Sequence, residues 1–323
     1  MYNRKDFIGG SDIASICGFG FKTPLEIYYE KVNGAKEDDI NKQNIFERGK
    51  ILEPFVKKLF ENKSNNIVSS CNEIITHDKY KFIKGTIDGY INDTNTIVEF
   101  KTALNFTRKF YGEENTDEIK TAYLLQGAWY LMLLPKANTV LFPILFGNEN
   151  EFSLIIKQIK KYGIDETIDN FSDYDLNFKI YKSERNEKLQ EKLLNIGVDF
   201  FTNNIQKLNP PNCTNFDDIK LLFNNEIKDS KVEADNDDLI LINEFKEKTN
   251  LSKALEKQIE EIKTKLCSKV GNSSFMIDQD KKIILSWKTQ NRSFLNQKKL
   301  DEENPNFLNK YFEQKQYRVL KVY

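Results

Sequence analysis

The first 60 residues alternate apolar and polar positions with the period of a helix, and they predict three helices. A turn with a good N-cap precedes a short helix over residues 13–17, and a second helix is predicted over 25–31. The third, over 46–60, carries a broad apolar stripe. Pro54 lies within it and would remove a backbone hydrogen bond, so we expect this helix either to start late or to bend near Glu53.

The pattern then changes to the two-residue period of β-strands. Residues 81–91 predict one continuous strand, with three isoleucines on one face and Asp88 on the other. After a turn, residues 96–102 predict the returning strand of a hairpin. Glu99 and Lys101 are two residues apart and therefore share a face. We expect Asp88 and Glu99 to lie on neighbouring strands, on the face directed away from the core.

The remaining segments mix helices and strands. The pattern predicts an apolar helix over 116–134, a strand over 140–146, a turn at 148–150, a helix or loop over 160–175, a helix capped by Ser183 that reaches Phe200, an amphipathic helix over 251–266, a hairpin over 275–287 and a final strand over 317–322.

Five acidic residues between Asp229 and Asp238 indicate a solvated linker or surface segment. They separate the N-terminal part of the chain from the amphipathic helix at 251–266, whose short apolar repeat indicates packing rather than a specific coiled coil. We therefore divide the chain into a first domain, residues 1–227, and an extension of unknown role, residues 228–323.

Composition restricts the chemistry, because the 323 residues include a single histidine, His77. Zinc sites with two or more histidines are excluded within one chain, and a serine or cysteine triad would depend on His77 alone. His77 itself is expected to be a turn residue. Hydrolysis by this chain would use carboxylates, lysine or a metal ion held by oxygen atoms.

Other classes of protein are excluded in the same way. The segment around Gly49-Lys50 lacks the upstream glycine of a P-loop, and no apolar run is long enough to span a membrane. No apolar segment follows the first six residues, as a signal peptide would require. The four cysteines form no CxxC pair and are expected to be small core residues, which favours a reducing, cytoplasmic location.

Charge is balanced, with 48 lysines and arginines against 49 aspartates and glutamates. A chain with this balance could bind nucleic acid only through a local basic groove. We therefore expect basic groups to line the active-site groove and the acids between 229 and 238 to lie away from it.

Several oxygen-bearing side chains and one lysine are predicted to meet around the hairpin: Asp88, Glu99, Lys101, Glu53 at the border of the preceding helical stripe, and Gln126 within the following apolar helix. Carboxylates of this kind suit Mg²⁺ or Mn²⁺, which prefer oxygen ligands and retain water molecules. Such ions activate water and neutralise charge on a phosphate. The lysine could position the attacking water without help from histidine.

Asp88 followed by Glu99-Phe100-Lys101 resembles the core motif of the PD-(D/E)XK nucleases. The order of motifs over roughly residues 1–210 resembles the YqaJ-type viral recombinases, the group that contains the phage λ-type exonucleases. The matching segments are Gly9 to Ala14, Arg48-Gly49, Glu53-Pro54, Gly85 to Gly89, Val98 to Thr102, and Gln126 with Tyr130. Ile87 replaces the proline of the motif name, and this position does not affect the metal chemistry.

The resemblance implies an α/β fold with a restriction-endonuclease-like core: a mixed central sheet flanked by helices, here followed by an α+β extension. It implies that Glu53, Asp88, Glu99 and the backbone carbonyl of Phe100 surround two Mg²⁺ or Mn²⁺ ions. Lys101 would be catalytic, and Gln126 would orient water or bind near the metal. Tyr130 is a further candidate residue of the site.

The resemblance also implies a pocket for a DNA 5′-phosphate, formed by Arg4, Ser11, Thr86 and the backbone of Ile87. The expected reaction is 5′→3′ degradation of one strand of a linear duplex. Its single-stranded product would pass to an annealing protein, and λ-type members of the group form ring-shaped trimers.

Each residue also has an ordinary structural explanation. Glu99 and Lys101 could form a surface ion pair, Asp88-Gly89 a turn, Glu53 part of a solvated face, Gln126 a buried amide and Ser11 a helix cap. For the whole protein, the rival functions are an endonuclease that needs no free end and a catalytically silent DNA-binding module. The second is disfavoured, because a silent module would not need all four of Glu53, Asp88, Glu99 and Lys101.

Overall fold

The computed structural model describes residues 4–34, 40–71, 73–171, 176–312 and 317–322, and the side chains of Arg4, 40–43 and 46 lie outside the description. Contacts divide the chain into two compact units, Met1–Ile219 and Lys220–Tyr323. The domain boundary expected between residues 227 and 228 stays a prediction. Within the described parts of the chain, no helix combines the length and apolar character needed to cross a bilayer.

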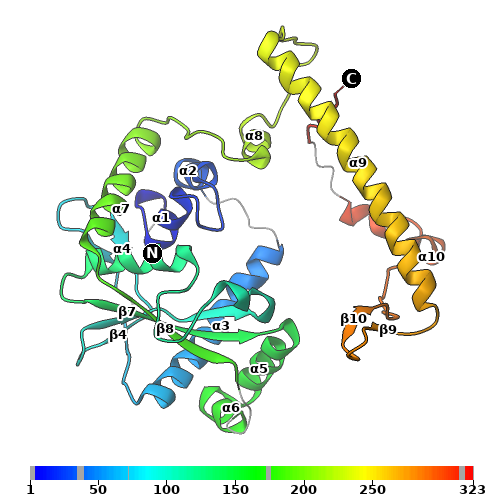
Figure 1. Ribbon diagram of the computed structural model, residues 1–323. Helices are drawn as coiled ribbons and strands as arrows, with labels where there is room; N and C mark the ends of the chain where they lie inside the picture. Colours follow the sequence, from blue (N-terminus) through cyan, green and yellow to red (C-terminus); the bar gives the residue numbers. More distant parts are fainter. Residues whose placement is uncertain (1–3, 35–39, 72, 172–175, 313–316, 323) are drawn as a thin grey trace. The chain divides into compact units, whose positions relative to one another are not determined.

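A six-stranded mixed sheet forms the centre of the first unit (Figure 1). The strands are β1 (Ser69–Ser70), β4 (Gly89–Ile91), β5 (Thr96–Val98), β6 (Lys101–Leu104), β7 (Thr139–Gly147) and β8 (Phe178–Glu184). β4 pairs antiparallel with both β1 and β5. β7 pairs parallel with β5 and β6 and antiparallel with β8.

The predicted strand over 96–102 is interrupted at Glu99 and Phe100, although β5 and β6 keep the same register against β7. Pro143 stands opposite the interruption and has no N–H to donate to the ladder. The Glu99 N–H still donates to the Leu141 carbonyl at 2.9 Å. The main chain therefore leaves regular strand geometry at the two residues for which chemistry was expected.

The predicted strand over 81–91 is also wrong as a single element. β3 (Lys84–Gly85) pairs with β2 (Ile75–Thr76) in a small separate sheet, whereas β4 belongs to the central sheet. Residues 86–88 connect the two sheets without regular structure. A strand period read from sequence does not reveal this change of partner, because side-chain alternation continues through it.

Helices cover both faces of the central sheet (Figure 1). One face packs against α3 (Ile40–Ser64), α5 (Glu149–Tyr162) and α6 (Ile164–Asn170), and the other against α1 (Gly10–Ile16), α4 (Thr121–Leu133) and α7 (Glu187–Asp199), with α2 (Pro24–Asn33) beside α1. The core on the α3 side includes Leu52, Phe55, Val56, Phe60, Val98, Leu145, Phe152 and Ile155. The layers also include two 3-10 helices, η1 (Arg4–Asp6) and η2 (Asn105–Phe110), and the π-helix η3 (Phe200–Ile205). The division between the two units falls within α8 (Phe216–Leu222).

Three helix boundaries differ from expectation for local reasons. α3 begins at Ile40 and continues through Pro54, so it does not start late. α5 replaces the predicted turn at 148–150, because the Asn148 side chain accepts the N–H groups of residues 150 and 151 and caps a helix. α7 is capped by Asn186 rather than by Ser183, which pairs with Val140 in β8.

Two further boundaries differ from expectation, the first because of a long-range partner and the second because of a local cap. The helix expected from residue 116 begins only at Thr121, because the Thr116 carbonyl accepts the backbone N–H of Lys182 in β8. In the second unit, α9 (Asn236–Val270) begins within the predicted acidic linker, where Asp235 caps it.

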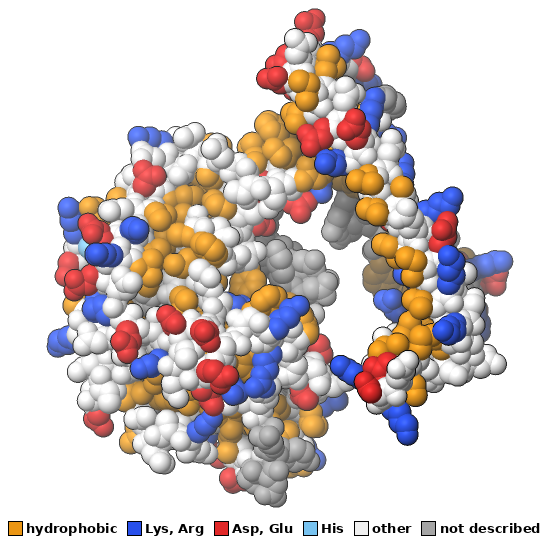
Figure 2. Space-filling model, in the orientation of Figure 1, with side chains coloured by type: hydrophobic (Ala, Val, Ile, Leu, Met, Phe, Trp, Pro, Cys, Tyr) orange, Lys and Arg blue, Asp and Glu red, His pale blue; other side chains and the backbone are white. Residues whose placement is uncertain are grey.

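The hairpin β9 (Phe275–Ile277) with β10 (Ile283–Ser286) matches the prediction in the second unit. α10 (Gln297–Glu303) and η4 (Phe307–Tyr311) follow it. The final strand expected over 317–322 is wrong, since those residues have no regular structure. Figure 2 shows blue and red side chains interspersed on the surface, in keeping with the balanced charge.

The predicted fold class is confirmed. The first unit is an α/β structure with a mixed central sheet between helical layers, and an α+β segment follows it. This arrangement places the interrupted strands, with Asp88 and Glu99, beneath α4.

Candidate active site

Asp88 and Glu99 lie side by side where β4 and β5 separate, and each carboxylate replaces a main-chain bond of the ladder. The Phe100 N–H donates to Asp88 Oδ2 at 3.0 Å, and the Asp88 N–H donates to Glu99 Oε1 at 3.4 Å. The two side chains therefore satisfy backbone groups that the departing strands leave without partners.

Lys101 and α4 complete the cluster around Glu99. Lys101 Nζ lies 2.9 Å from Glu99 Oε2, and Gln126 Nε2 donates to the same oxygen at 3.3 Å. Gln126 also donates to the Tyr130 hydroxyl at 2.9 Å. Gln126 is therefore partnered on both sides, as a polar side chain on an apolar helix requires. The expected neighbourhood of Glu99 and Lys101 is confirmed, but α4 covers Glu99 and leaves it 1% exposed rather than on an open face.

Glu53 stands at the edge of this cluster, on the exposed side of α3. Partial burial and the Asp88 charge raise its pKa, while the Lys101 ammonium lowers it. No hydrogen bond joins the Glu53 side chain to the cluster in the described part of the structure. Its carboxylate is thus electrostatically close to Asp88 and Lys101 without direct contact.

Electrostatics of the cluster are dominated by two carboxylates that share one buried volume. Burial and the neighbouring Asp88 charge raise the pKa of Glu99 to about 8. Burial likewise raises the pKa of Asp88, against the effect of Lys101 and the Phe100 N–H. Burial opposes the charged form of Lys101, but Glu99 and Asp88 raise its pKa above the ordinary value. Lys101 therefore offsets only part of the cost of ionising both carboxyl groups in this buried site.

Tyr130 packs against two glycines, Gly10 and Gly85, which belong to two of the motifs named in the sequence. A Cβ on Gly10 in α1 would lie 2.7 Å from a Tyr130 ring carbon, and one on Gly85 in β3 would lie 2.9 Å from the same ring. Neither approach is possible for a larger residue without displacement. The glycines therefore let the helix α1 and the strand β3 close on the ring that positions Gln126.

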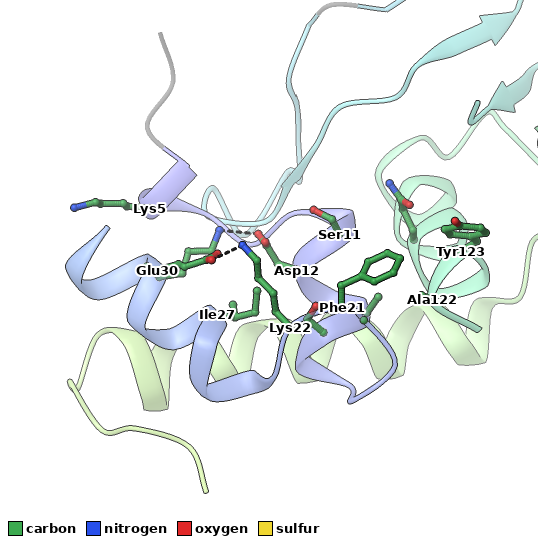
Figure 3. Close-up of a pocket in the computed structure, with 14 residues that line it drawn as sticks. Lys5, Ser11, Asp12, Phe21, Lys22, Ile27, Glu30, Ala122 and Tyr123 are labelled. Carbon is green, nitrogen blue, oxygen red and sulfur yellow. Dashed lines mark hydrogen bonds and ion pairs between the residues drawn. The ribbon is translucent and has the colours of Figure 1, made fainter. Parts of the chain in front are cut away.

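A cavity of about 320 Å³ lies between α1, α2 and α4 and borders the cluster through Gln126 (Figure 3). Asp12 and Lys31 form a buried ion pair of 2.6 Å in its wall, and Lys22 pairs with Glu30. Lys5 also lines the cavity. Basic groups thus line it, as expected of a groove near the site, but acids accompany them.

The residues expected to hold a 5′-phosphate are only partly described. Ser11 lines the cavity, whereas the side chain of Arg4 lies outside the described residues. Thr86 is exposed and Ile87 is buried, both in the irregular segment before Asp88. Their common role stays a prediction.

Two residues near the cluster were not identified from sequence. The Tyr123 ring centroid lies 5.5 Å from Lys101 Nζ, and the same ring is flanked by Lys120 at 5.9 Å. The spacing of Tyr123, Gln126 and Tyr130 places all three on one helical face, which could have revealed Tyr123. Nothing in the sequence pattern distinguishes Lys120 from other lysines.

The histidine and the cysteines take no part in the cluster. His77 Nδ1 accepts the backbone N–H groups of Lys79 and Tyr80, which supports its expected place in a turn. All four cysteines are free, and they are half-buried rather than fully in the core. Among the described residues, no group of three His, Cys, Asp or Glu side chains converges at metal-binding distance.

Comparison with known proteins identifies relatives for the N-terminal part of the chain. The family model of the YqaJ-like viral recombinase domain matches residues 2–134. The uncharacterized protein YqaJ of Bacillus subtilis (strain 168) is 32% identical over 171 residues, which are 52% of this chain and 51% of that protein. The chain therefore spans about half the length of this curated relative.

Two solved structures show a limited similarity. An alkaline exonuclease from Laribacter hongkongensis is 17% identical with a TM-score of 0.44, covering 64% of this chain and 92% of that one. A phage-related exonuclease from Haemophilus somnus 129PT is 16% identical with a TM-score of 0.45, covering 62% and 96%. The sequence match confirms the resemblance expected from the motifs, since residues 2–134 match the model of the YqaJ-like viral recombinase domain.

Proposed function

We propose that this chain is a metal-dependent deoxyribonuclease that hydrolyses phosphodiester bonds. The observation that carries the proposal is the buried cluster of Asp88, Glu99 and Lys101 at the interrupted strands. A structural ion pair would not need two adjacent carboxylates with raised pKa values.

The donor set fits Mg²⁺ or Mn²⁺. Asp88, Glu99 and the Phe100 carbonyl would supply the oxygen ligands, and Mg²⁺ usually keeps several waters and takes few protein ligands. Glu53 would approach as an outer carboxylate. A bound divalent ion supplies an activated water and neutralises charge on the phosphate. Two ions, as the resemblance implies, remain part of the proposal.

The chain's own residues would prepare the reaction. Lys101 is held charged by Glu99 and Asp88, so its ammonium can orient the attacking water and stabilise negative charge on the phosphate. Gln126 spans Glu99 and Tyr130, so its amide can fix the Glu99 carboxylate or a water beside it. Tyr130, held between its glycines, limits the positions available to Gln126.

The YqaJ-like domain supports the narrower proposal of an exonuclease that resects one strand of linear duplex DNA in the 5′→3′ direction. Ser11 at the cavity, with Arg4, Thr86 and Ile87, would bind the 5′-phosphate. The product strand would pass to a single-strand annealing protein in the cytoplasm of a bacterial or phage-infected cell. A homotrimer would be the corresponding assembly.

One assay tests this proposal. Purified chain is incubated with Mg²⁺ and three DNA substrates: a 5′-phosphorylated linear duplex, the same duplex with 5′-hydroxyl ends, and a closed circle. We expect rapid degradation of the phosphorylated duplex, slower degradation of the hydroxyl form and an intact circle. Cleavage of the circle would indicate an endonuclease. No cleavage of any substrate, with Mg²⁺ or Mn²⁺, would indicate a silent binding module.

A further inference from the structure

Lys120 is a half-buried lysine whose charge has no acidic partner among the described residues. It stands at the N-cap position of α4 and is half-buried. Its Nζ atom lies 6.0, 5.8 and 5.9 Å from the ring centroids of Phe21, Tyr111 and Tyr123. Burial lowers its pKa, and no neighbouring carboxylate offsets that effect.

Aromatic faces attract a cation but accept none of its strong hydrogen bonds in the way a carboxylate does. The Lys120 ammonium is therefore oriented by three rings while its N–H groups stay available. Three lysines that line the cavity or belong to the cluster are paired with acids: Lys22 with Glu30, Lys31 with Asp12 and Lys101 with Glu99. A partly desolvated ammonium of this kind is completed by an anion from outside the chain.

The position of Lys120 indicates that this anion is a phosphate of the substrate. Lys120 and the catalytic Lys101 flank the same Tyr123 ring. Tyr123 and Phe21 also line the cavity, and Figure 3 shows the Phe21 ring reaching toward Ala122 and Tyr123 on α4. A DNA strand whose reacting phosphate lies at Lys101 would bring a neighbouring phosphate toward Lys120.

Phe21 adds a second, apolar contact at the same place. Its side chain is 80% exposed, so the ring face is open to a ligand. Exposed aromatic rings beside a cation are typical of surfaces on which nucleic-acid bases stack. The neighbouring Phe19, 59% exposed in the same loop, does not line the cavity.

We propose that Lys120 and Phe21 form a substrate-positioning site, in which Lys120 binds a backbone phosphate of the DNA strand and Phe21 stacks on a base. The inference rests on the proposed nuclease function and adds to it the contact that guides the strand from the cavity to Lys101. Lys120 is here a positioning residue, acting on the substrate away from the reacting atoms.

Binding is tested separately from cleavage. A fluorescein-labelled, 5′-phosphorylated duplex is titrated with protein in EDTA, at a series of NaCl concentrations, and anisotropy is recorded. We expect Lys120→Ala to weaken binding about tenfold and to reduce the salt dependence by about one phosphate contact. Lys120→Arg should retain most of the affinity, and Phe21→Ala should weaken binding with little change in salt dependence.

Two control variants match these changes. Lys161→Ala removes another lysine that lies over an aromatic ring, that of Tyr162 at the end of α5, and Phe19→Ala removes the neighbouring exposed ring. Both should bind DNA as the unmodified chain does. Unchanged affinity and salt dependence in Lys120→Ala would overturn the inference.

Steady-state degradation with Mg²⁺ then distinguishes this inference from the proposed function. In Lys120→Ala, KM should rise more than kcat falls, because the catalytic cluster is intact. If the unmodified chain degrades no DNA, the nuclease proposal fails, and the anisotropy measurement still decides whether Lys120 contacts DNA. If the unmodified chain is active and Lys120→Ala has the same KM, only the inference fails.

Discussion

Glu99 and Asp218 are two carboxylates of the first unit that are equally hidden from solvent, each 1% exposed. Their pKa values nevertheless shift in opposite directions. Burial and Asp88 raise that of Glu99 to about 8. Burial opposes the charge of Asp218 too, but donors from Thr23 and Thr214 lower its pKa below the ordinary value.

The difference lies in what surrounds each charge. Asp218 accepts hydrogen bonds from the Thr23 hydroxyl at 2.5 Å and from the Thr214 N–H and hydroxyl at 2.7 and 2.8 Å. Glu99 has one lysine, one amide and a second carboxylate. Neutral dipoles make Asp218 a completed structural contact, whereas the site disfavours ionisation of Glu99 and Asp88 together, which a divalent cation would reverse.

The largest expected effect is a loss of activity when the Glu99 region, rather than the Asp218 region, is changed. Lys101→Ala should reduce Mg²⁺-dependent degradation of a linear duplex by about 10²-fold or more, because the reacting water loses its oriented cation. Circular dichroism should show an unchanged fold. Lys182→Ala removes a surface lysine paired with Glu184 and should leave activity unchanged. Undiminished activity in Lys101→Ala would contradict the assigned site.

Asp218→Asn tests the structural side of the comparison. An amide would turn an N–H group toward the threonine donors, so we expect the free energy of unfolding to fall by about 1–3 kcal/mol while DNA degradation by the folded protein persists. Urea denaturation measures the first effect. Asp165→Asn, which removes an exposed carboxylate 3.0 Å from Lys58, should change stability by less than about 1 kcal/mol. Equal losses of unfolding free energy in Asp218→Asn and Asp165→Asn would show that Asp218 stabilises the fold no more than a surface carboxylate does.

The pH dependence of stability follows from the direction of the Asp218 shift. Its folded pKa lies below the unfolded value, so its contribution is complete above about pH 4 and is lost as the pH falls through the lower folded value. The difference in unfolding free energy between the unmodified chain and Asp218→Asn should therefore be constant near neutrality and shrink in acid. Urea titrations at several pH values would show a constant difference throughout if the charge were irrelevant.

Thr23 gives the smallest effect, since it caps α2 by accepting the Glu26 N–H and also donates to Asp218. Thr23→Ala should cost about 1 kcal/mol, and Thr23→Ser, which keeps the hydroxyl, much less. Combined with Asp218→Asn, the loss should be less than the sum of the single losses, because the two residues share one hydrogen bond. Additive losses would mean that the threonine stabilises the helix alone.

Local sequence signals identified much of this fold. The first two helices, the hairpin at 275–287 and strand β7 follow from caps, turns and apolar period alone. β8 was missed, because Ser183 has the character of a helix cap and its actual partner, Val140, lies 43 residues earlier. The same limit explains the division of residues 81–91 between two sheets.

The candidate site divides in a similar way. Asp88, Glu99 and Lys101 stand close together in sequence on a predicted hairpin, and Gln126 was conspicuous on an apolar helix, so their meeting could be predicted. The cover of α4 over Glu99 and the three rings around Lys120 depend on tertiary packing. Those contacts have no local period that sequence could reveal.

The contact of Tyr130 with Gly10 and Gly85 has a consequence for how related sequences can diverge. The three positions are far apart in the chain, yet the Tyr130 ring fits only because Gly10 and Gly85 carry no side chain. A larger residue at either glycine becomes tolerable only after the ring is lost, and loss of the ring leaves Gln126 without its hydroxyl partner. Among related sequences, we expect these three positions to change together or not at all.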